Sequence, residues 1–108
     1  MQTFSVRAVQ SDVLQLVDGL NSKQRRTLEA VFTLPVRSDI TWVDLESLFL
    51  ALGASVRNAK RGSGVRVVLN DKLGHFHKPH PEKEVCQRAV DAARDLLEDA
   101  GAAPKSES

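Results

Sequence analysis

The chain contains three histidines, and all of them fall within six residues: His75, His77 and His80. Histidine is the side chain that most readily takes up or gives a proton near neutral pH. Metal-independent cleavage of RNA needs two such transfers, because a base deprotonates the ribose 2′-OH and an acid protonates the departing 5′-oxygen. We therefore predict His77 as the base or the acid, and His80 as a second proton-transfer group or a phosphate anchor.

The same reaction needs cations that stabilise the negative charge gathering on the phosphate. Basic residues are concentrated between Arg57 and Arg66, a segment without any acid. We predict Arg66 as the cation that stabilises the transition state. Other residues in and near this segment are expected to contact RNA: Arg57, Lys60, Arg61, Ser63, His75 and Lys78.

Each of these residues also has an ordinary structural interpretation. His80 could cap a helix, His75 could be an exposed strand residue, and Lys60 and Arg61 could belong to a solvated loop. The three histidines could also ligate zinc. A change from strand to helix around Pro79 disfavours their convergence on one ion, so we expect no metal and no cofactor.

The first elements are predicted from periodicity and capping residues. Residues 1–21 are compatible with a short helix capped by Ser11 or with an extended arm, and a second helix follows Ser22 and ends before Pro35. A third helix begins at the N-cap Thr41 and ends at Gly53. Its predicted buried stripe is Leu45, Leu48, Phe49 and Leu52. Two other side chains of this region are expected to be partly exposed and available to an interface: Trp42 and Leu50.

Three short strands without intervening helices follow, at about residues 54–58, 65–69 and 73–78, and predict an antiparallel meander. Alternation places one set of side chains toward the helices: Val56, Val65, Val67, Leu69 and Phe76. The other set faces water: Ser55, Arg57, Arg66, Val68, His75 and His77. This open face has no aromatic platform for stacking bases, which favours contacts to phosphate and sugar.

The last helix is predicted to begin at Pro81, with His80 at the N-cap, where free backbone N–H groups could hold a phosphate. Its predicted buried stripe is Val85, Ala89, Ala93, Leu96, Leu97 and Ala100. The fold class is therefore α+β: helix, three-stranded antiparallel sheet and helix, with an extra N-terminal helix. The chain divides into an N-terminal extension (1–21), one domain (22–101) and a disordered tail (102–108).

Composition limits the function classes. With 108 residues, 42% of them apolar, the chain fits one domain, and its net charge of +1 means that attraction for nucleic acid must come from a local patch. Cys86 is the only cysteine, which excludes an internal disulfide and suits a reducing compartment. There is neither a signal-peptide profile nor an apolar run near the ~20 residues that a membrane span needs. We expect a cytoplasmic protein without a membrane partner.

Four motifs in this order resemble the HicA toxins of toxin–antitoxin pairs. They run from Ile40 to Leu48, from Leu52 to Ala54, from Gly62 to Arg66 and from His77 to Pro81. The resemblance covers about residues 22 to 101 and is closest to a longer subgroup with an extra N-terminal helix. It implies a fold like the double-stranded-RNA-binding domain, cleavage of mRNA, and a HicB-like antitoxin that blocks the toxin.

The chain departs from the family's motif at one position. HicA toxins usually carry a catalytic histidine after a Gly-Ser pair, whereas Gly62-Ser63 is followed here by Gly64. Two other functions therefore stay open beside the ribonuclease: an RNA- or ribosome-binding module without catalysis, and a protein-interaction partner without nuclease activity.

Overall fold

Three helices and three strands lie wholly within the described part of the chain, and residues 16–18, also described, are helical and precede them. A computed structural model describes residues 16–35, 39–60, 62, 64–79 and 83–102. The elements are α2 (Ser22–Val31), α3 (Trp42–Ala51), β1 (Ser55–Asn58), β2 (Gly64–Leu69), β3 (Lys72–His77) and α4 (Gln87–Asp99). The strands form an antiparallel sheet in the order β1-β2-β3. The predicted α+β class and the antiparallel meander are confirmed.

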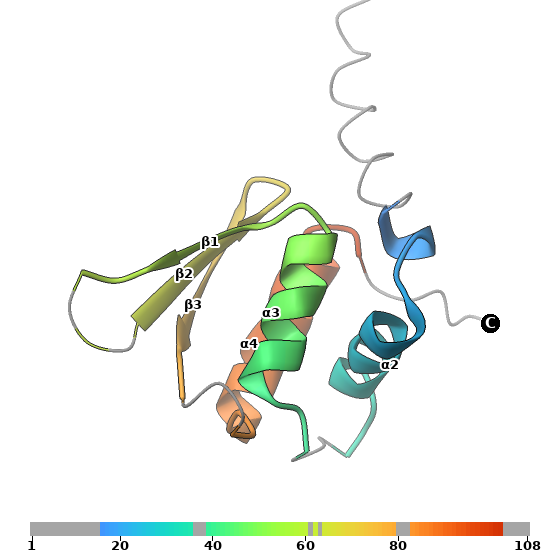
Figure 1. Cartoon of the computed structure of the whole chain (residues 1–108), viewed down its shortest axis with the longest axis horizontal. Helices are drawn as coiled ribbons and strands as arrows, with labels where there is room; N and C mark the ends of the chain where they lie inside the picture. The colour runs from blue at the N-terminus through green and yellow to red at the C-terminus, as the bar shows by residue number, and fades with distance from the viewer. Residues whose placement is uncertain (1–15, 36–38, 61, 63, 80–82, 103–108) are drawn as a thin grey trace, which may run out of the picture.

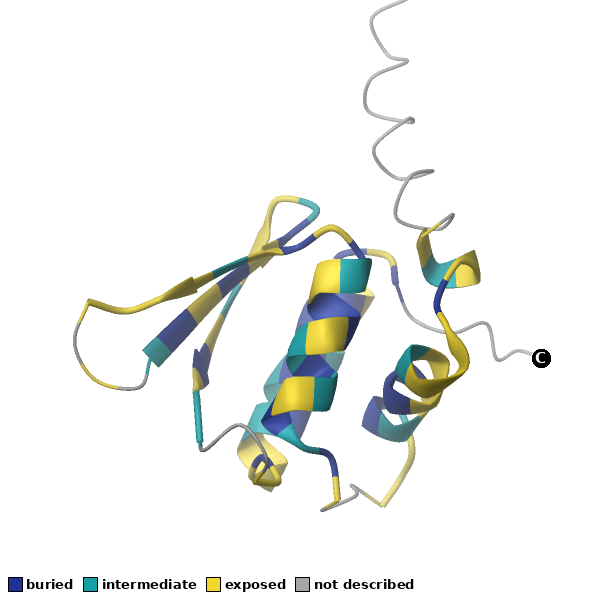
Figure 2. Cartoon of the chain, in the orientation of Figure 1, coloured by how far each residue is buried: buried dark blue, intermediate teal, exposed yellow. Residues whose placement is uncertain are grey.

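The helices cover only one face of this sheet. Helix α3 contacts β1 and α4 contacts β3, while α2 packs against α3 and α4 on the side away from the sheet (Figure 1). Strand β2 alternates buried and exposed residues, which appear as alternating bands in Figure 2. The other face of the sheet is left to solvent.

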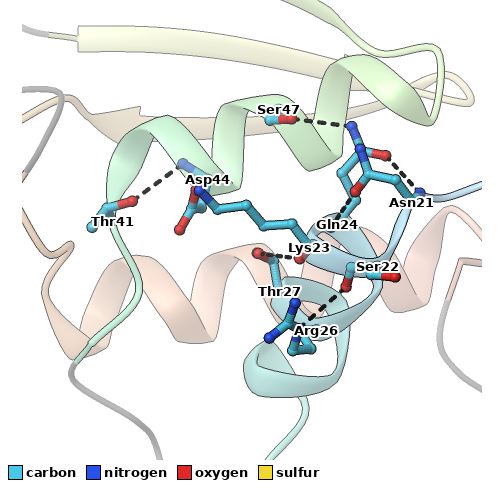
Figure 3. A network of polar contacts seen from close by, with 9 residues as sticks. All are labelled: Asn21, Ser22, Lys23, Gln24, Arg26, Thr27, Thr41, Asp44 and Ser47. Carbon is cyan, nitrogen blue, oxygen red and sulfur yellow. Dashed lines mark hydrogen bonds and ion pairs between the residues drawn. The ribbon is translucent and has the colours of Figure 1, made fainter.

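Polar contacts fix the starts of α2 and α3 and join the two helices (Figure 3). Asn21 and Gln24 form a reciprocal capping box at α2, and Thr41 Oγ1 accepts a hydrogen bond from the N–H of Asp44 at 3.2 Å. Between the helices, Lys23 Nζ lies 3.3 Å from Asp44 Oδ1, and Gln24 Nε2 donates to Ser47 Oγ at 3.1 Å. The predicted cap at Thr41 is confirmed.

A two-residue turn sets the pairing of β2 with β3. Asn70 and Asp71 both have positive φ, at 51° and 68°, as a type I′ hairpin turn requires. Asn70 Nδ2 also donates to the carbonyl of Ala100 at 3.0 Å, so the turn is tied to the end of α4. The resulting register pairs Leu69 with Lys72, and the pairing continues residue by residue to Gly64 with His77.

The predicted start of the last helix is wrong. Helix α4 begins at Gln87 with Cys86 at its N-cap, not at Pro81. The reason is a non-local pairing, because residues 83–85 run antiparallel to the chain that enters α3. Trp42 N donates to the carbonyl of Lys83 at 3.1 Å, and Val85 N donates to the carbonyl of Ile40 at 2.8 Å. Val85 is buried, as expected, but in this extended segment rather than on the helix.

The core includes Leu20 and Ala102, which lie just outside the predicted domain boundaries at residues 22 and 101. Leu50 is 53% exposed, as expected, whereas the expectation for Trp42 is wrong because its side chain is only 1% exposed. Trp42 packs against Phe76, with 6.0 Å between the ring centroids and the two ring planes tilted by 50°.

Among the described residues, no helix has both the length and the apolar character that crossing a membrane demands.

The N-cap of α3 gives a first prediction. Thr41→Ala removes the acceptor for the Asp44 N–H, so the free energy of unfolding should fall by about 1 kcal/mol. Thr41→Ser is the matched control, because it keeps the hydroxyl and should retain most of the stability. Urea denaturation measures both variants, and equal loss in both would contradict a capping role.

Candidate functional site

Strand register brings three of the predicted site residues into one row across the sheet. Arg57 on β1 pairs with Arg66 on β2, and Arg66 pairs with His75 on β3. All three are exposed and belong to the face that the helices leave open. We call this row the cationic ladder. Side chains directly opposite each other on neighbouring strands have Cβ atoms about 5 Å apart, so the three groups can act on one anion.

His77 lies on the same face, two residues beyond His75 along β3, and is exposed. Two residues along a strand span about 6.5 Å, so the imidazoles of His75 and His77 start from neighbouring positions on one surface. The residue paired with His77 is Gly64, which has no side chain to cover it. Arg66 is directly opposite His75 and diagonal to His77, and it is therefore the cation next to both histidines.

The division of the sheet into an apolar and an open face is confirmed. Val65, Val67, Leu69 and Phe76 are buried, and Val56 is half-buried against the core. The side chains predicted to face water are all exposed: Ser55, Arg57, Arg66, Val68, His75 and His77. Within the described strands, the outward positions carry no carboxylate.

Phe76 holds β3 from behind. Its ring packs against Phe49 and Trp42, with centroid distances of 5.5 and 6.0 Å, so the backbone that carries His75 and His77 is held on its inner side. Gly74 allows α4 to approach the same strand, since a Cβ at this position would lie 3.0 Å from Leu96 Cδ2. The two histidines therefore stand on a strand that is packed against the core.

The guanidinium groups of the cationic ladder are available to a ligand. In the part of the chain that the structure describes, neither Arg57 nor Arg66 makes an ion pair or a side-chain hydrogen bond. Lys23 and Arg94, by contrast, each pair with an aspartate. Unpaired cations in a row on a face without acids make a site for a polyanion.

A hollow of about 500 Å³ lies where the three strands end near the β1–β2 loop. Its lining residues come from the ends of the strands and from the loop: Arg57, Asn58, Ala59, Lys60, Gly64, Val65, Arg66, His75 and Phe76. Lys60 is exposed beside the cationic ladder, as expected, and Lys78 is half-buried after β3. The hollow therefore gathers four of the predicted residues: Arg57, Lys60, Arg66 and His75.

The predicted setting of His80 is wrong, because α4 begins at Gln87 and its free N–H groups belong to another part of the chain. His80 itself, together with Arg61 and Ser63, lies outside the described residues. The alternative zinc site included His80 and is therefore not described either. Among the described residues, no three His, Cys, Asp or Glu side chains gather in a way that could hold a metal ion.

Sequence reasoning placed His75 among the RNA contacts but missed that it lies directly opposite Arg66. The signal was available in the turn length. Once Asn70 and Asp71 form a two-residue turn, residue 69 pairs with 72, and Arg66 must pair with His75.

Comparison with protein-family models, curated proteins and solved structures finds no match to this chain. The resemblance to HicA toxins therefore stays a prediction that depends on the residues quoted for it.

The cationic ladder predicts a small stability effect. Like charges directly opposite each other on a sheet destabilise it, so Arg66→Gln should raise the free energy of unfolding by about 0.5 kcal/mol at low ionic strength. The gain should shrink at high ionic strength, where exposed charges are screened. Lys72→Gln is the control, since it removes one charge from the sheet outside the ladder. Urea denaturation at two salt concentrations checks both, and an equal gain for Lys72→Gln would argue against repulsion within the ladder.

Proposed function

We propose that this chain is an endoribonuclease of the HicA toxin kind, which cuts mRNA on the open face of its sheet. The observation that carries the proposal is the cationic ladder with two histidines: Arg57, Arg66 and His75 in one row, and His77 next along β3. The unpaired arginines attract the phosphate backbone, and the two neighbouring histidines of β3 supply the proton transfers. We further propose that the fold is like the double-stranded-RNA-binding domain and that the protein works in the cytoplasm.

The proposed reaction needs only groups of the chain and the RNA. One histidine of the pair removes the proton from a ribose 2′-OH, and the oxygen attacks the adjacent phosphorus. The bond from phosphorus to the 5′-oxygen breaks, and the second histidine gives its proton to that oxygen. The products are a 2′,3′-cyclic phosphate and a 5′-hydroxyl. Arg66, which lies opposite His75, stabilises the negative charge on the phosphate as the bond order changes.

Cleavage of a defined mRNA fragment in excess EDTA tests this function. The parent chain should cut it, and His75→Ala and His77→Ala should each lower the rate by about 100-fold or more, because each removes one proton transfer. Arg66→Ala should lower it by a similar factor. Lys72→Ala is the matched control on β3 and should keep the parent rate. An RNA with 2′-O-methyl at the cut position should stay intact.

Three results would contradict the proposed enzyme in distinguishable ways. RNA that is bound but not cut, with an affinity that falls steeply as salt rises, would indicate a binding module without catalysis. Neither binding nor cleavage would favour a protein-interaction partner. Cleavage that survives both histidine substitutions would assign the activity to other groups.

We also propose that a HicB-like antitoxin inhibits the enzyme by covering the same face, with acidic side chains where the phosphate would lie. The absence of carboxylates from the outward strand positions that the structure describes supports such complementarity.

If one face serves both partners, Arg66→Glu should lower RNA cleavage by about 100-fold or more and weaken antitoxin binding by about tenfold or more. The antitoxin to be used is the product of the neighbouring reading frame if that frame encodes a small HicB-like protein, and calorimetry measures its binding. Arg88→Glu on α4 is the control, an equal charge reversal at another exposed arginine. If Arg66→Glu changes neither property, the face is not shared.

A further inference from the structure

The open face continues beyond the cationic ladder. Ser55 on β1 pairs with Val68 on β2, and Val68 pairs with Leu73 on β3. We call this row the apolar ladder. It lies two residues along the strands from the cationic ladder, which corresponds to about 6.5 Å.

Two neighbouring apolar side chains of this row are open to water. Val68 is 38% exposed and Leu73 is 54% exposed, although β2 buries Val67 and Leu69 almost completely and β3 buries Phe76. Leu73 contributes little to the core at this position, and together with Val68 it places two exposed apolar side chains side by side on the open face. Because this apolar pair lies beside unpaired arginines, the open face has an apolar part next to a cationic part.

We propose that the apolar ladder binds the base of an unpaired nucleotide whose phosphate lies on the cationic ladder. The proposal rests on the proposed function and names its substrate class as single-stranded RNA at the cut position. A nucleotide has the two halves that the face has, because its phosphate is anionic and the faces of its base are apolar. The Ser55 hydroxyl, at the end of the ladder, can donate to or accept from the edge of that base.

A paired base cannot reach this surface. In a duplex each base is stacked between its neighbours and bonded to its partner, so that its faces are covered. The sheet presents side chains in shallow rows rather than a wedge that could open a duplex. Only a nucleotide that is already unpaired can lay its base on Val68 and Leu73 without the energy of unstacking.

The apolar ladder lies at the end of the sheet beside the β2–β3 turn, which α4 holds in place. The turn that follows Leu69 is held by Asn70, whose amide donates to the carbonyl of Ala100 at 3.0 Å. Behind Leu73 and His75, Gly74 leaves room for Leu96 of α4 to pack closely. A preformed surface loses little conformational freedom when it binds a base, which strengthens binding by a small apolar contact.

Short RNAs with one abasic nucleotide, placed in turn at each position around the cut, test this site. Binding is measured with cleavage blocked by 2′-O-methyl at the cut position. Leu73→Ser should weaken binding of the intact RNA by about tenfold, as expected when an apolar contact of this size is lost. With the RNA that lacks the base on the ladder, Leu73→Ser should cause no further loss. Val68→Thr should show the same non-additivity with a smaller effect.

Leu50→Ser is the control for the loss of an exposed leucine, since Leu50 lies on α3 and is equally exposed. Thermal unfolding checks that each variant keeps its fold. If Leu73→Ser and the abasic position weaken binding additively, or if a fully paired RNA binds and is cut as well as the single strand, the base site is overturned. If the parent neither binds nor cuts any RNA, the proposed function fails, and the base site fails with it.

Discussion

The burial of Val65, Val67 and Leu69 against the helices is the constraint on which the rest of the molecule depends. Side chains of a strand alternate between its faces, so three inward residues determine where all the others point. A slip of one residue would bring the Arg66 guanidinium into the core and expose the three apolar side chains. The basic open face is therefore a consequence of how the core forms, and it cannot vary independently of it.

The stability of the same core allows the sheet to keep a row of like charges on its open face, although these charges repel each other. Like charges directly opposite each other destabilise a sheet by about 0.2 to 1 kcal/mol per pair. A fully buried large apolar side chain contributes about 1.5 to 3 kcal/mol, and Trp42, Phe49 and Val67 are all buried almost completely. A few such residues outweigh the repulsion between Arg57 and Arg66. The fold can thus keep an unpaired cationic row, which is of use only when an anion is bound.

Local signals in the sequence were enough for α3, the strands and the assignment of their faces. The cap at Thr41 and the alternation from Val65 to Leu69 depend on near neighbours, and both predictions are confirmed. The start of α4 was predicted wrongly, because Pro81 is typical of a first helical turn while the pairing of Val85 with Ile40 is invisible in the sequence. The β2–β3 register was missed because the turn was expected over three residues, Asn70 to Lys72, whereas only Asn70 and Asp71 form it, and the β1–β2 register depends on a longer loop.

The two ends of the open face are held by different means, and this bears on what each end can do. At the turn, Asn70 is bonded to Ala100 and Leu96 packs at Gly74, so the apolar ladder is carried by backbone that α4 holds in place. At the other end, Ala59 N donates to the carbonyl of Gly64 at 2.8 Å, and Phe76 anchors β3 from behind. Catalysis by fixed charges requires that the cations need not reorganise during the reaction. The two anchored ends meet that requirement for the backbone that carries Arg66 and His75, so only their side chains have to become ordered when an anion binds.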